Sequence, residues 1–432
     1  MSSIFKKKKP KLNYDTDPVS VNRTGERGGE RIESVYGEGE NRQPNKRYKR
    51  ISVFVGLVKY VVITVFFLFF MTMTFVYSSE INVENFRYIL KDMNLKIPTG
   101  IEEYGEIYYV ADMEQSYAVY RDDFVCVSRG AVEVIDMAGK QVQKTALKYV
   151  KPRLVTSGKY MLVYDLSNTQ YAIFNTFSEL HSESLQYPIS DADMNDDGYY
   201  LIVTRDAEYK SVVSVYNKDM KQVYTYQSND RYIFDAHLYN DGSVVLCAGS
   251  TRSGRYYAEI LKGNIRSGEV KTVWSSPSVM PLTMLKSDSN MTAVLCTDTV
   301  LFFSGDELVA EYGFYGRVCR RFACGDGYTA ILLSSEGAGA DSELMIFDKT
   351  GTLIHKGQSS SDMSALYVHG GNVYGLYTGC VERYEINTEK TYRADTGYEV
   401  KGLVFPDNEI VLFATASSAA PVSVYDGFKE IR

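Results

Sequence analysis

Residues 189–204 read ISDADMNDDGYYLIVT, and residues 233–248 read IFDAHLYNDGSVVLCA. The two stretches align without a gap, with the second beginning 44 residues after the first. Each contains an extended run, a tight turn rich in Asp, Asn and Gly, and a second hydrophobic run, a pattern typical of a β-hairpin. A hairpin that recurs at a regular interval indicates a repeat architecture.

The first turn also resembles a calcium-binding loop, because Asp191, Asp193 and Asn195 alternate ahead of an Asp-Gly pair. In the second copy, the third and fifth ligand positions are occupied by His237 and Tyr239. The glycine that an EF-hand needs at its sixth position is also missing. Because the turn recurs and the ligand set does not, we predict that the loop is a structural turn and that the chain has no metal site.

The same turn followed by a strand occurs eight times along the chain. The last turn residues are 123, 158, 198, 242, 290, 327, 371 and 408, and neighbouring ones lie 35 to 48 residues apart. Two more strand-like segments follow each hairpin, as in residues 211–226 and 343–357. A period near forty with four short strands is typical of a propeller blade. We therefore predict an all-β, eight-bladed β-propeller over residues 105–426, with a seven-bladed ring or an open β-solenoid as alternatives.

The two ends of the repeat region support a closed ring. The last unit supplies three strands, ending at residues 422–426, and an unpaired strand-like segment, residues 105–112, precedes the first unit. If the early segment completes the last blade, the ring has no open edge at its seam. Residues 427–432 then form a short C-terminal tail.

One segment near the N-terminus is far more apolar than the rest of the chain. From Ile51 to Tyr77 the only charged residue is Lys59, and the uninterrupted part after it is about 18 residues long, enough for roughly 27 Å of helix. Since this segment has no polar face to place against water, we predict a transmembrane helix over residues 51–77.

The charge distribution predicts the orientation of this helix. Residues 1–50 contain 13 Lys and Arg against 7 Asp and Glu. Positive flanks stay in the cytoplasm, so the predicted location is the cell membrane, with a single pass, a cytoplasmic N-terminus and an extracytoplasmic propeller. Once the +6 of this segment and the charge of Lys59 are removed from the total of −7, residues 60–432 have a net charge of −14.

The segments on either side of the apolar helix have different predicted structures. Residues 1–50 are rich in Gly, Glu and Arg and poor in apolar residues, so we expect a disordered basic tail. Residues 78–104 place apolar side chains at helical spacing before Pro98, which predicts a stalk with a short amphipathic helix.

Residues 105–426 resemble the quinoprotein-like and WD-type group of β-propellers, on the basis of their turns and four-strand units. The whole layout is similar to an uncharacterised family of bacterial single-pass membrane proteins with an exported propeller. A WD repeat would have a Trp-Asp pair in each blade, whereas the chain has one tryptophan, Trp274. Repeated tryptophan motifs and an adjacent cysteine pair, expected of a cofactor-binding quinoprotein, are also missing. The resemblance therefore implies the fold and the membrane anchor, and no cofactor is expected.

The sequence has no motif for a common catalytic chemistry. It lacks a G-x-S-x-G elbow, an H-E-x-x-H pair, a phosphate loop and a G-x-G-x-x-G fingerprint. Its six cysteines form no C-x-x-C motif; Cys126, Cys247 and Cys296 lie in second strands, where we expect them to pack between blades. Cys319 and Cys324 are the pair that could form a disulfide. We predict no catalytic residues.

A polar column emerges when the eight units are aligned on their turns. The residue seven positions before the last turn residue is polar in every unit: Ser116, Lys151, Asp191, Asp235, Thr283, Arg320, Ser364 and Lys401. Because the first strand of a blade lines the axis of a propeller, we predict that these residues face an axial channel and form a candidate ligand-binding surface. The alternative is that they solvate the channel.

These patterns favour a non-enzymatic, membrane-anchored binding or scaffolding module for a protein or glycan of the cell envelope. Nucleic acid is a poor partner for an acidic exported domain. One alternative is an exported glycoside hydrolase or lyase that uses Asp191, Asp193, Asp235 and His237. The other is a transmembrane sensor that signals through the basic tail.

Overall fold

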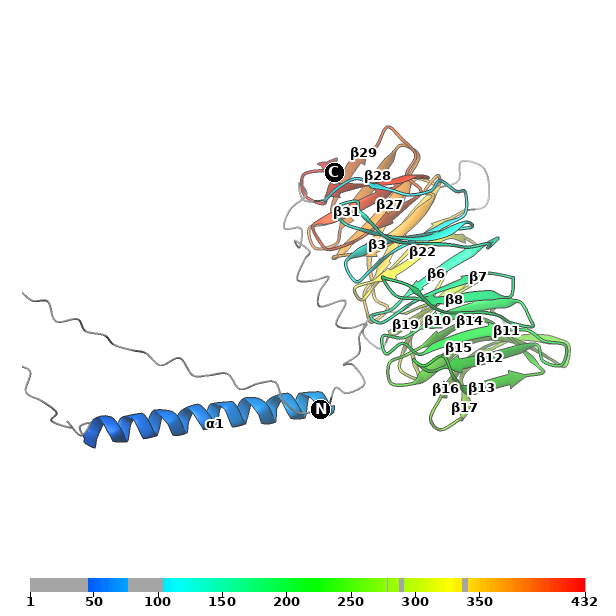
Figure 1. Ribbon diagram of the computed structural model, residues 1–432. Coiled ribbons are helices and arrows are strands. Elements are labelled where there is room, and N and C mark those ends of the chain that lie inside the picture. The colour runs from blue at the N-terminus through cyan, green and yellow to red at the C-terminus, as the bar shows by residue number, and fades with distance from the viewer. Residues whose placement is uncertain (1–45, 77–103, 278, 287–290, 336–340, 432) are drawn as a thin grey trace, which may run out of the picture. The chain divides into compact units, whose positions relative to one another are not determined.

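The computed structural model describes residues 46–76, 104–277, 279–286, 291–335 and 341–431, and the chain divides into two compact units, residues 1–96 and 97–432. In the first unit, helix α1 (Lys46–Val76) contains a 23-residue apolar stretch, Arg50–Thr72, that is long enough to span a membrane (Figure 1). Every residue of this stretch except Gly56 is exposed. The predicted tail, apart from its last residues in α1, and the predicted stalk helix lie outside the described residues.

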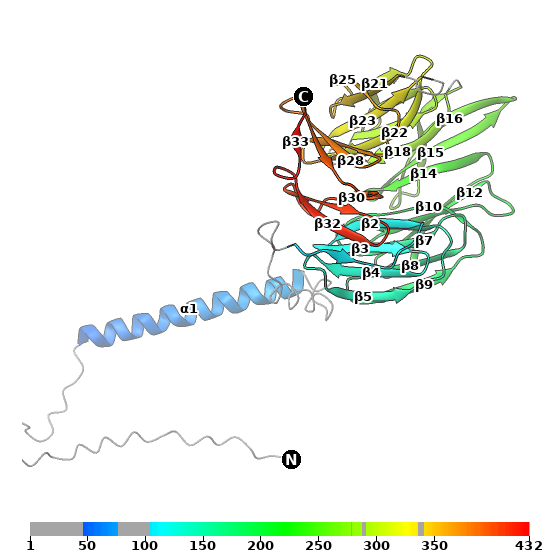
Figure 2. The same ribbon diagram turned by 90° about the horizontal axis from the view of Figure 1, so that it is seen from above.

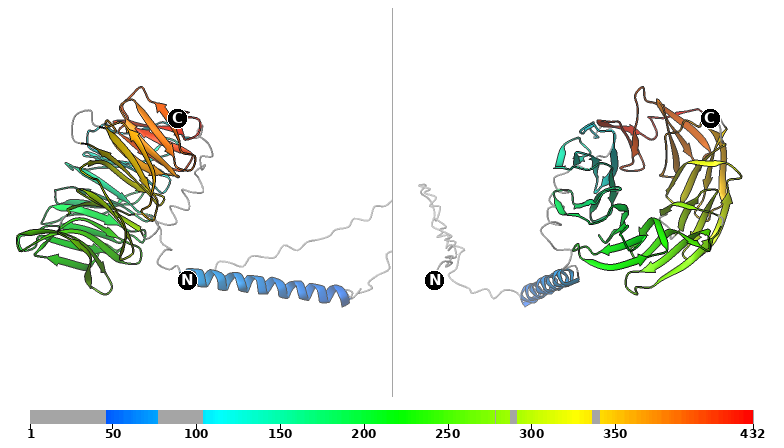
Figure 3. Two further views of the ribbon diagram at one scale, coloured as in Figure 1. Left: turned by 180° about the vertical axis from the view of Figure 1, so that it is seen from behind. Right: turned by 90° about the vertical axis from the view of Figure 1, so that its right-hand side faces the viewer.

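The second unit consists of eight antiparallel sheets arranged in a ring about a common axis (Figure 3). In each sheet, strands that follow one another in the chain lie side by side. The first strands of neighbouring blades contact one another, so they form the inner wall of the ring. The fold is an eight-bladed β-propeller, as the sequence predicted.

The first four blades have four strands each. In chain order they are β2 (Gln115–Tyr120), β3 (Asp123–Ser128), β4 (Ala131–Asp136) and β5 (Gln141–Ala146); β6 (Pro152–Thr156), β7 (Met161–Asp165), β8 (Gln170–Phe174) and β9 (Glu179–Ser184); β10 (Ile189–Met194), β11 (Tyr200–Thr204), β12 (Ser211–Tyr216) and β13 (Gln222–Ser228); and β14 (Arg231–Leu238), β15 (Ser243–Arg252), β16 (Arg255–Asn264) and β17 (Val270–Ser276).

The remaining blades follow the same order around the ring (Figure 2). Blades 5 to 7 comprise β18 (Pro281–Lys286), β19 (Met291–Cys296), β20 (Thr299–Ser304) and β21 (Glu307–Gly313); β22 (Val318–Gly325), β23 (Tyr328–Ser334), β24 (Ser342–Phe347) and β25 (Leu353–Ser359); and β26 (Ala365–His369), β27 (Asn372–Tyr377), β28 (Cys380–Glu385) and β29 (Lys390–Asp395). Blade 8 comprises β30 (Gly402–Val404), β31 (Ile410–Ala414), β32 (Ser418–Ser423) and β1 (Ile107–Tyr108).

The hydrophobic core lies between the blades. The middle strands are apolar on both faces, and all residues of β3, β7 and β31 are buried because each face packs on a neighbouring blade. Between blades 3 and 4, for example, Leu201 and Val213 pack against Leu246. Burying one such side chain contributes about 1.5–3 kcal/mol.

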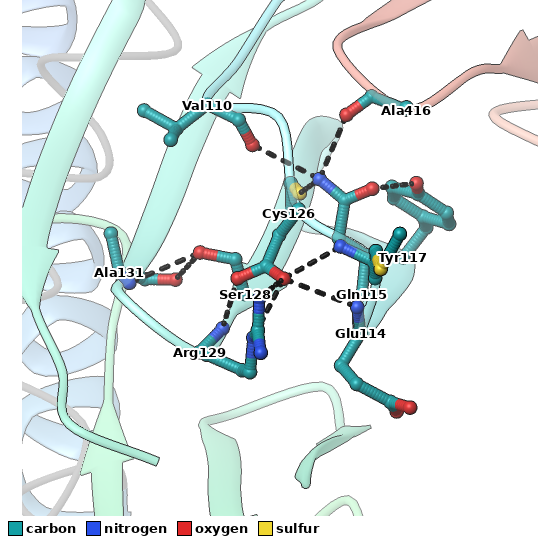
Figure 4. Close-up of polar contacts among 11 residues, drawn as sticks. Val110, Glu114, Gln115, Tyr117, Cys126, Ser128, Arg129, Ala131 and Ala416 are labelled. Atoms are coloured by element: carbon teal, nitrogen blue, oxygen red, sulfur yellow. Dashed lines mark hydrogen bonds and ion pairs between the residues drawn. The ribbon is translucent and has the colours of Figure 1, made fainter. Parts of the chain in front are cut away.

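The ring closes through β1, which pairs with β32 and supplies the outer strand of blade 8, as the sequence predicted. The side chain of Gln115 strengthens this seam: its Nε2 donates to the carbonyl oxygens of Val110 and Ala416 at 3.0 and 3.1 Å (Figure 4). Tyr117 donates to Gln115 Oε1 at 2.6 Å and so fixes the orientation of the amide. Blade 1 is therefore joined to blade 8 by side chains as well as by strand pairing.

The C-terminal residues form a second clasp that the sequence did not reveal. Strand β33 (Lys429–Glu430) pairs with β29 and becomes the fifth strand of blade 7. Phe428, just before it, is buried among Tyr374 and Phe413 of blades 7 and 8. Blade 8 is thus held to blade 1 by the N-terminal strand and to blade 7 by the C-terminal one.

Candidate functional site

The residues of the polar column lie on the inner wall of the ring. Five are on first strands (Ser116, Asp191, Asp235, Thr283 and Arg320), and three directly precede a first strand (Lys151, Ser364 and Lys401). Four of the eight are exposed, namely Lys151, Arg320, Ser364 and Lys401, and the other four, Asp191 among them, are mostly buried. The strand registers place the column at equivalent positions only in blades 1, 3, 4 and 5, at Ser116, Asp191, Asp235 and Thr283. Whether the column binds a ligand stays a prediction.

The column is displaced by one residue in blade 6. The first strands of blades 3, 4 and 5 each have a bulge immediately before the column residue, at Ser190 in the case of Asp191. In blade 6 the bulge falls on Arg320 itself, so Arg321 occupies the position equivalent to Asp191. The reason is the turn: the hairpin of blade 6 closes over the two residues Asp326 and Gly327, which makes it shorter than the turn in blade 3.

Three carboxylates link the first strands of blades 3, 4 and 5. Asp191 accepts a hydrogen bond from the backbone N–H of Ala236 at 2.8 Å, and Asp193 accepts one from Leu238 at 2.9 Å. Asp235 repeats the contact one blade further on, accepting from the N–H of Met284 at 2.6 Å. Each carboxylate therefore satisfies a backbone donor of the next blade that strand pairing leaves free.

Thr283 and His237 complete this axial cluster, which we define as Asp191, Asp193, Asp235, His237 and Thr283. The hydroxyl of Thr283 donates to Asp235 Oδ2 at 2.6 Å. His237 Nδ1 lies 3.2 Å from Asp193 Oδ2, and its Nε2 lies 3.1 Å from the carbonyl oxygen of Met284 and 4.0 Å from Asp235 Oδ1. Both ring nitrogens thus face acceptors, a geometry that suits the doubly protonated imidazolium.

The electrostatics of the cluster favour protonation. Burial raises the pKa of Asp191 to about 8, and the charge of Asp235 adds to this effect. Burial alone would lower the pKa of His237, but the hydrogen bond and charge of Asp193 and the charge of Asp235 outweigh it and raise the value to about 9. At neutral pH the cluster therefore combines a protonated carboxyl group with a cationic histidine.

The polar side chains of the loop that resembles a calcium site make contacts between blades. Asn195 donates to the carbonyl oxygen of Tyr239 at 3.2 Å, and Asp196 accepts from the amide of Asn240 at 2.9 Å. Gly198 closes the turn with a φ of +82°, which explains its conservation between the two copies of the hairpin. Among the described residues, no group of three His, Cys, Asp or Glu side chains is arranged to hold a metal ion.

The cysteines are all free thiols. Cys126 packs against blade 8, and Cys247 and Cys296 pack together between blades 4 and 5, as predicted from their strand positions. Cys319 and Cys324 do not form a disulfide: the thiol of Cys319 donates to the carbonyl oxygen of Arg321 at 3.3 Å, and that of Cys324 lies 2.9 Å from the hydroxyl of Thr329. Burial raises the pKa of Cys296 and of Cys319 to about 12, so both are weak nucleophiles at neutral pH.

The structure also contains a groove that the sequence did not reveal. It lies between blades 6 and 7, has a volume of about 610 Å³, and is lined by His355, Gln358, Tyr377, Tyr384 and Arg393, among others. His355 and Tyr384 form a pair in its wall: the Tyr384 hydroxyl and His355 Nδ1 are 2.8 Å apart, and the ring centroids are 4.1 Å apart. Burial lowers the pKa of His355, so this imidazole is neutral at neutral pH.

Fold and site together define an eight-bladed β-propeller that follows one long apolar helix. Residues 101–420 match the sequence profile of a family of unknown function, DUF5711. Because the match spans well over half of the 432 residues, the chain belongs to this family. A comparison with curated proteins found no match.

Solved structures show the same fold at low sequence identity. BamB from Moraxella catarrhalis is 13% identical, with a TM-score of 0.53 over 75% of this chain and 98% of that chain. Sqt1 from Saccharomyces cerevisiae is 9% identical, with a TM-score of 0.51 over 76% of this chain and 98% of that chain. These similarities establish the propeller architecture.

Proposed function

We propose that the protein is a non-enzymatic binding or scaffolding module, anchored in the cell membrane by a single helix, that presents its propeller to a protein or glycan of the cell envelope. The apolar stretch Arg50–Thr72, with no residue buried inside the protein, supports the anchor. The basic residues before it favour a cytoplasmic N-terminus and an extracytoplasmic propeller.

The observation that carries this proposal is the use of the axial carboxylates as links between blades. Asp191, Asp193 and Asp235 each accept a backbone hydrogen bond from the next first strand. A carboxylate committed in this way holds the inner wall in one arrangement, and a rigid surface binds partners with less loss of conformational entropy. The exposed side chains of Lys151, Arg320 and Lys401 lie on or directly before the first strands of their blades and are available for contact.

Photo-crosslinking in intact cells tests the proposal. A crosslinking residue is placed at Lys151, Arg320 or Lys401 of the full-length protein, because these exposed side chains can be replaced without removing a carboxylate that links two blades. A probe at Lys140, in the turn between β4 and β5, is the control. We expect one envelope protein or glycan to be captured from the inner-wall positions and not from Lys140.

A parallel measurement checks the membrane topology. An epitope after Arg432 should be cleaved by protease added outside intact cells. Cleavage of the epitope only after the cells are lysed would contradict the proposed orientation.

In the crosslinking experiment, equal capture from all four probe positions, or capture from none, would contradict a specific inner-wall partner.

A second candidate function is a glycoside hydrolase or lyase, favoured by the raised pKa of Asp191. A carboxyl group that stays protonated near neutral pH can act as a general acid, with Asp193 or Asp235 as the partner carboxylate. Asp191→Asn keeps the shape of the side chain and removes the acid. If the protein hydrolyses oligosaccharides and this variant does not, the enzymatic function replaces the binding function.

A further inference from the structure

The groove between blades 6 and 7 is lined by a glycine from each of the two facing blades. In each blade, alternate side chains of the second strand point toward the preceding blade, and the middle one of these packs in the interface. In blades 1 to 6 it is Cys126, Val163, Ile202, Leu246, Val294 and Ile331. In blade 7 the same position is Gly375, which lines the groove.

The opposite wall of the groove is also hollowed. The fourth strands of the blades can be aligned on their bulges. In this alignment, the position two residues after that of His355 faces the next blade, and it is occupied by Tyr226 in blade 3 and by Tyr312 in blade 5. In blade 6 it is Gly357. A Cβ atom added there would lie 2.7 Å from His355 Nε2, so the glycine leaves room for the imidazole. Glycine therefore stands on both sides of this interface, and both glycines line the groove.

The lining of the groove is apolar at its base and rich in hydroxyl and amide groups at its rim. Leu344, Met363 and Val373 supply the apolar part. The polar part consists of Gln358, Ser359, Ser360, Tyr377, Glu382, Tyr384, Glu389, Thr391 and Arg393. A volume of about 610 Å³ lies within the range of small-molecule sites. The fitting ligand has one apolar face and an edge of many hydrogen-bonding groups.

The charges of the groove narrow the ligand class further. Glu382 and Arg393 lie 3.9 Å apart and partly neutralise each other, and Glu389 adds a second carboxylate. The carboxylates outnumber the guanidinium group, so the groove repels phosphates and other polyanions. His355 is neutral and offers one donor or one acceptor without a charge. An uncharged, hydroxyl-rich ring with an apolar C–H face meets all of these conditions.

We propose that the groove between blades 6 and 7 is a binding site for an uncharged saccharide, with the sugar ring packed on the partly exposed side chains of Leu344 and His355 and its hydroxyl groups bonded to Gln358, Thr391 and Arg393. This assignment rests on the proposed binding function and adds to it a ligand class and a second surface, on blades 6 and 7, whereas the axial cluster lies on blades 3 to 5. Ile431, beside the C-terminal clasp, borders the groove.

Calorimetric titration of the full-length protein in detergent tests the assignment. The probes are chitotetraose, cellotetraose and maltotetraose, with tetragalacturonate as the charged control. We expect at least one neutral tetrasaccharide to bind with a Kd of about 1 mM or tighter, and tetragalacturonate not to bind. Failure of all three neutral probes at that level overturns the proposal, as does preferential binding of tetragalacturonate.

Two variants localise the binding. Gly375→Val fills the groove, and its Cβ would meet Met363 Cε at 2.8 Å, the flexible end of a side chain that can move. Gly313→Val is the matched control in a strand, where the nearest atom to the new Cβ is a Tyr315 ring atom at 3.8 Å. We expect Gly375→Val to weaken saccharide binding by about tenfold or more and Gly313→Val to leave it unchanged.

A third variant keeps the test valid if Gly375→Val does not fold. Gln358→Ala with Thr391→Ala removes two rim groups and leaves the apolar base intact, and it should also weaken binding by about tenfold. Unchanged affinity in both groove variants overturns the proposal, and so does binding of a tetrapeptide at this site in preference to the sugars. A partner captured at the inner wall without any saccharide binding would remove this assignment and retain the proposed function.

Discussion

The interfaces between blades 3 and 4 and between blades 6 and 7 are built from equivalent strands but are filled differently. In the first, Leu246 meets Leu201 and Val213, and Tyr224 and Tyr226 cover the outer part. In the second, Gly375 and Gly357 stand at the positions of Leu246 and Tyr226, and a groove remains. Because seven other interfaces and two clasps hold the ring, one interface can give up packing and become a binding site.

The largest expected effect comes from emptying the filled interface. Leu246→Ala should lower the free energy of unfolding by about 3 kcal/mol, since it removes a buried side chain from a packed core. Leu344→Ala, at the wall of the groove, should cost about 1 kcal/mol because that side chain is already partly exposed. Thermal unfolding of the detergent-solubilised protein measures both, and equal losses would contradict the contrast between the two interfaces.

The two interfaces should also respond to pH in opposite directions through their histidines. The pKa of His237 is raised in the folded protein, so its contribution is fully present below pH about 6.5 and is lost as pH rises to about 9. The loss should be about 3 kcal/mol, because each unit of pKa difference corresponds to about 1.4 kcal/mol, and His237→Gln should flatten it. Asp191 acts in the same direction between pH about 4 and 8, because its pKa is raised too.

His355 provides the opposing case. Its pKa is lowered, so the unfolded chain takes up a proton before the folded protein does, and stability is lost as pH falls below about 6.5. His355→Gln should remove this loss. The unfolding temperatures of the two variants and of the unmodified protein are measured between pH 5 and 9. If both variants showed the same pH dependence as the unmodified protein, the opposite roles of the two histidines would be contradicted.

The smallest effect is expected from a methyl group added in the groove. Gly375→Ala should stabilise the protein by no more than about 0.5 kcal/mol, because glycine in a strand interior has more conformational freedom to lose on folding. Part of this gain is offset by the contact of the new Cβ with Met363 Cε, at 2.8 Å. Gly351→Ala is the control: its φ of +77° and a Phe302 ring atom at 2.8 Å from the new Cβ make the change destabilising. A loss of stability at Gly375 would show that the groove is too narrow for even one methyl group.

The propeller could be predicted from the sequence because its signals are local. The Asp-Gly turns at Gly198, Gly242 and Gly327 have left-handed backbone and recur in blades 3, 4 and 6. The missing fourth strand of the last blade was visible by counting, which made the closure by β1 predictable. The axial cluster was partly visible too, since Asp191, Asp193, Asp235 and His237 were grouped as one possible site.

The details of the candidate sites depend on contacts between blades, and an alignment of the turns gives no information about these contacts. The bulge at Arg320 moves the column to Arg321, and only strand register reveals it. The carboxylates were expected to face a channel, whereas their hydrogen bonds to Ala236, Leu238 and Met284 depend on the spacing of neighbouring strands. The groove did have a signal, Gly375 in a column of larger residues, but its meaning required knowing which face of the strand meets blade 6.

The seam of the ring has a consequence for biosynthesis. Ile107 of β1 pairs with Ala419, which is about 310 residues later in the chain. At about 5–20 residues per second, β1 waits roughly 15–60 s for its partner strand to be made. Blades 1 to 7 must therefore hold together as an open arc during translation, with the first blade unsupported on one side. The β33 clasp follows β32 in the chain, so it is made after the strand that completes the seam.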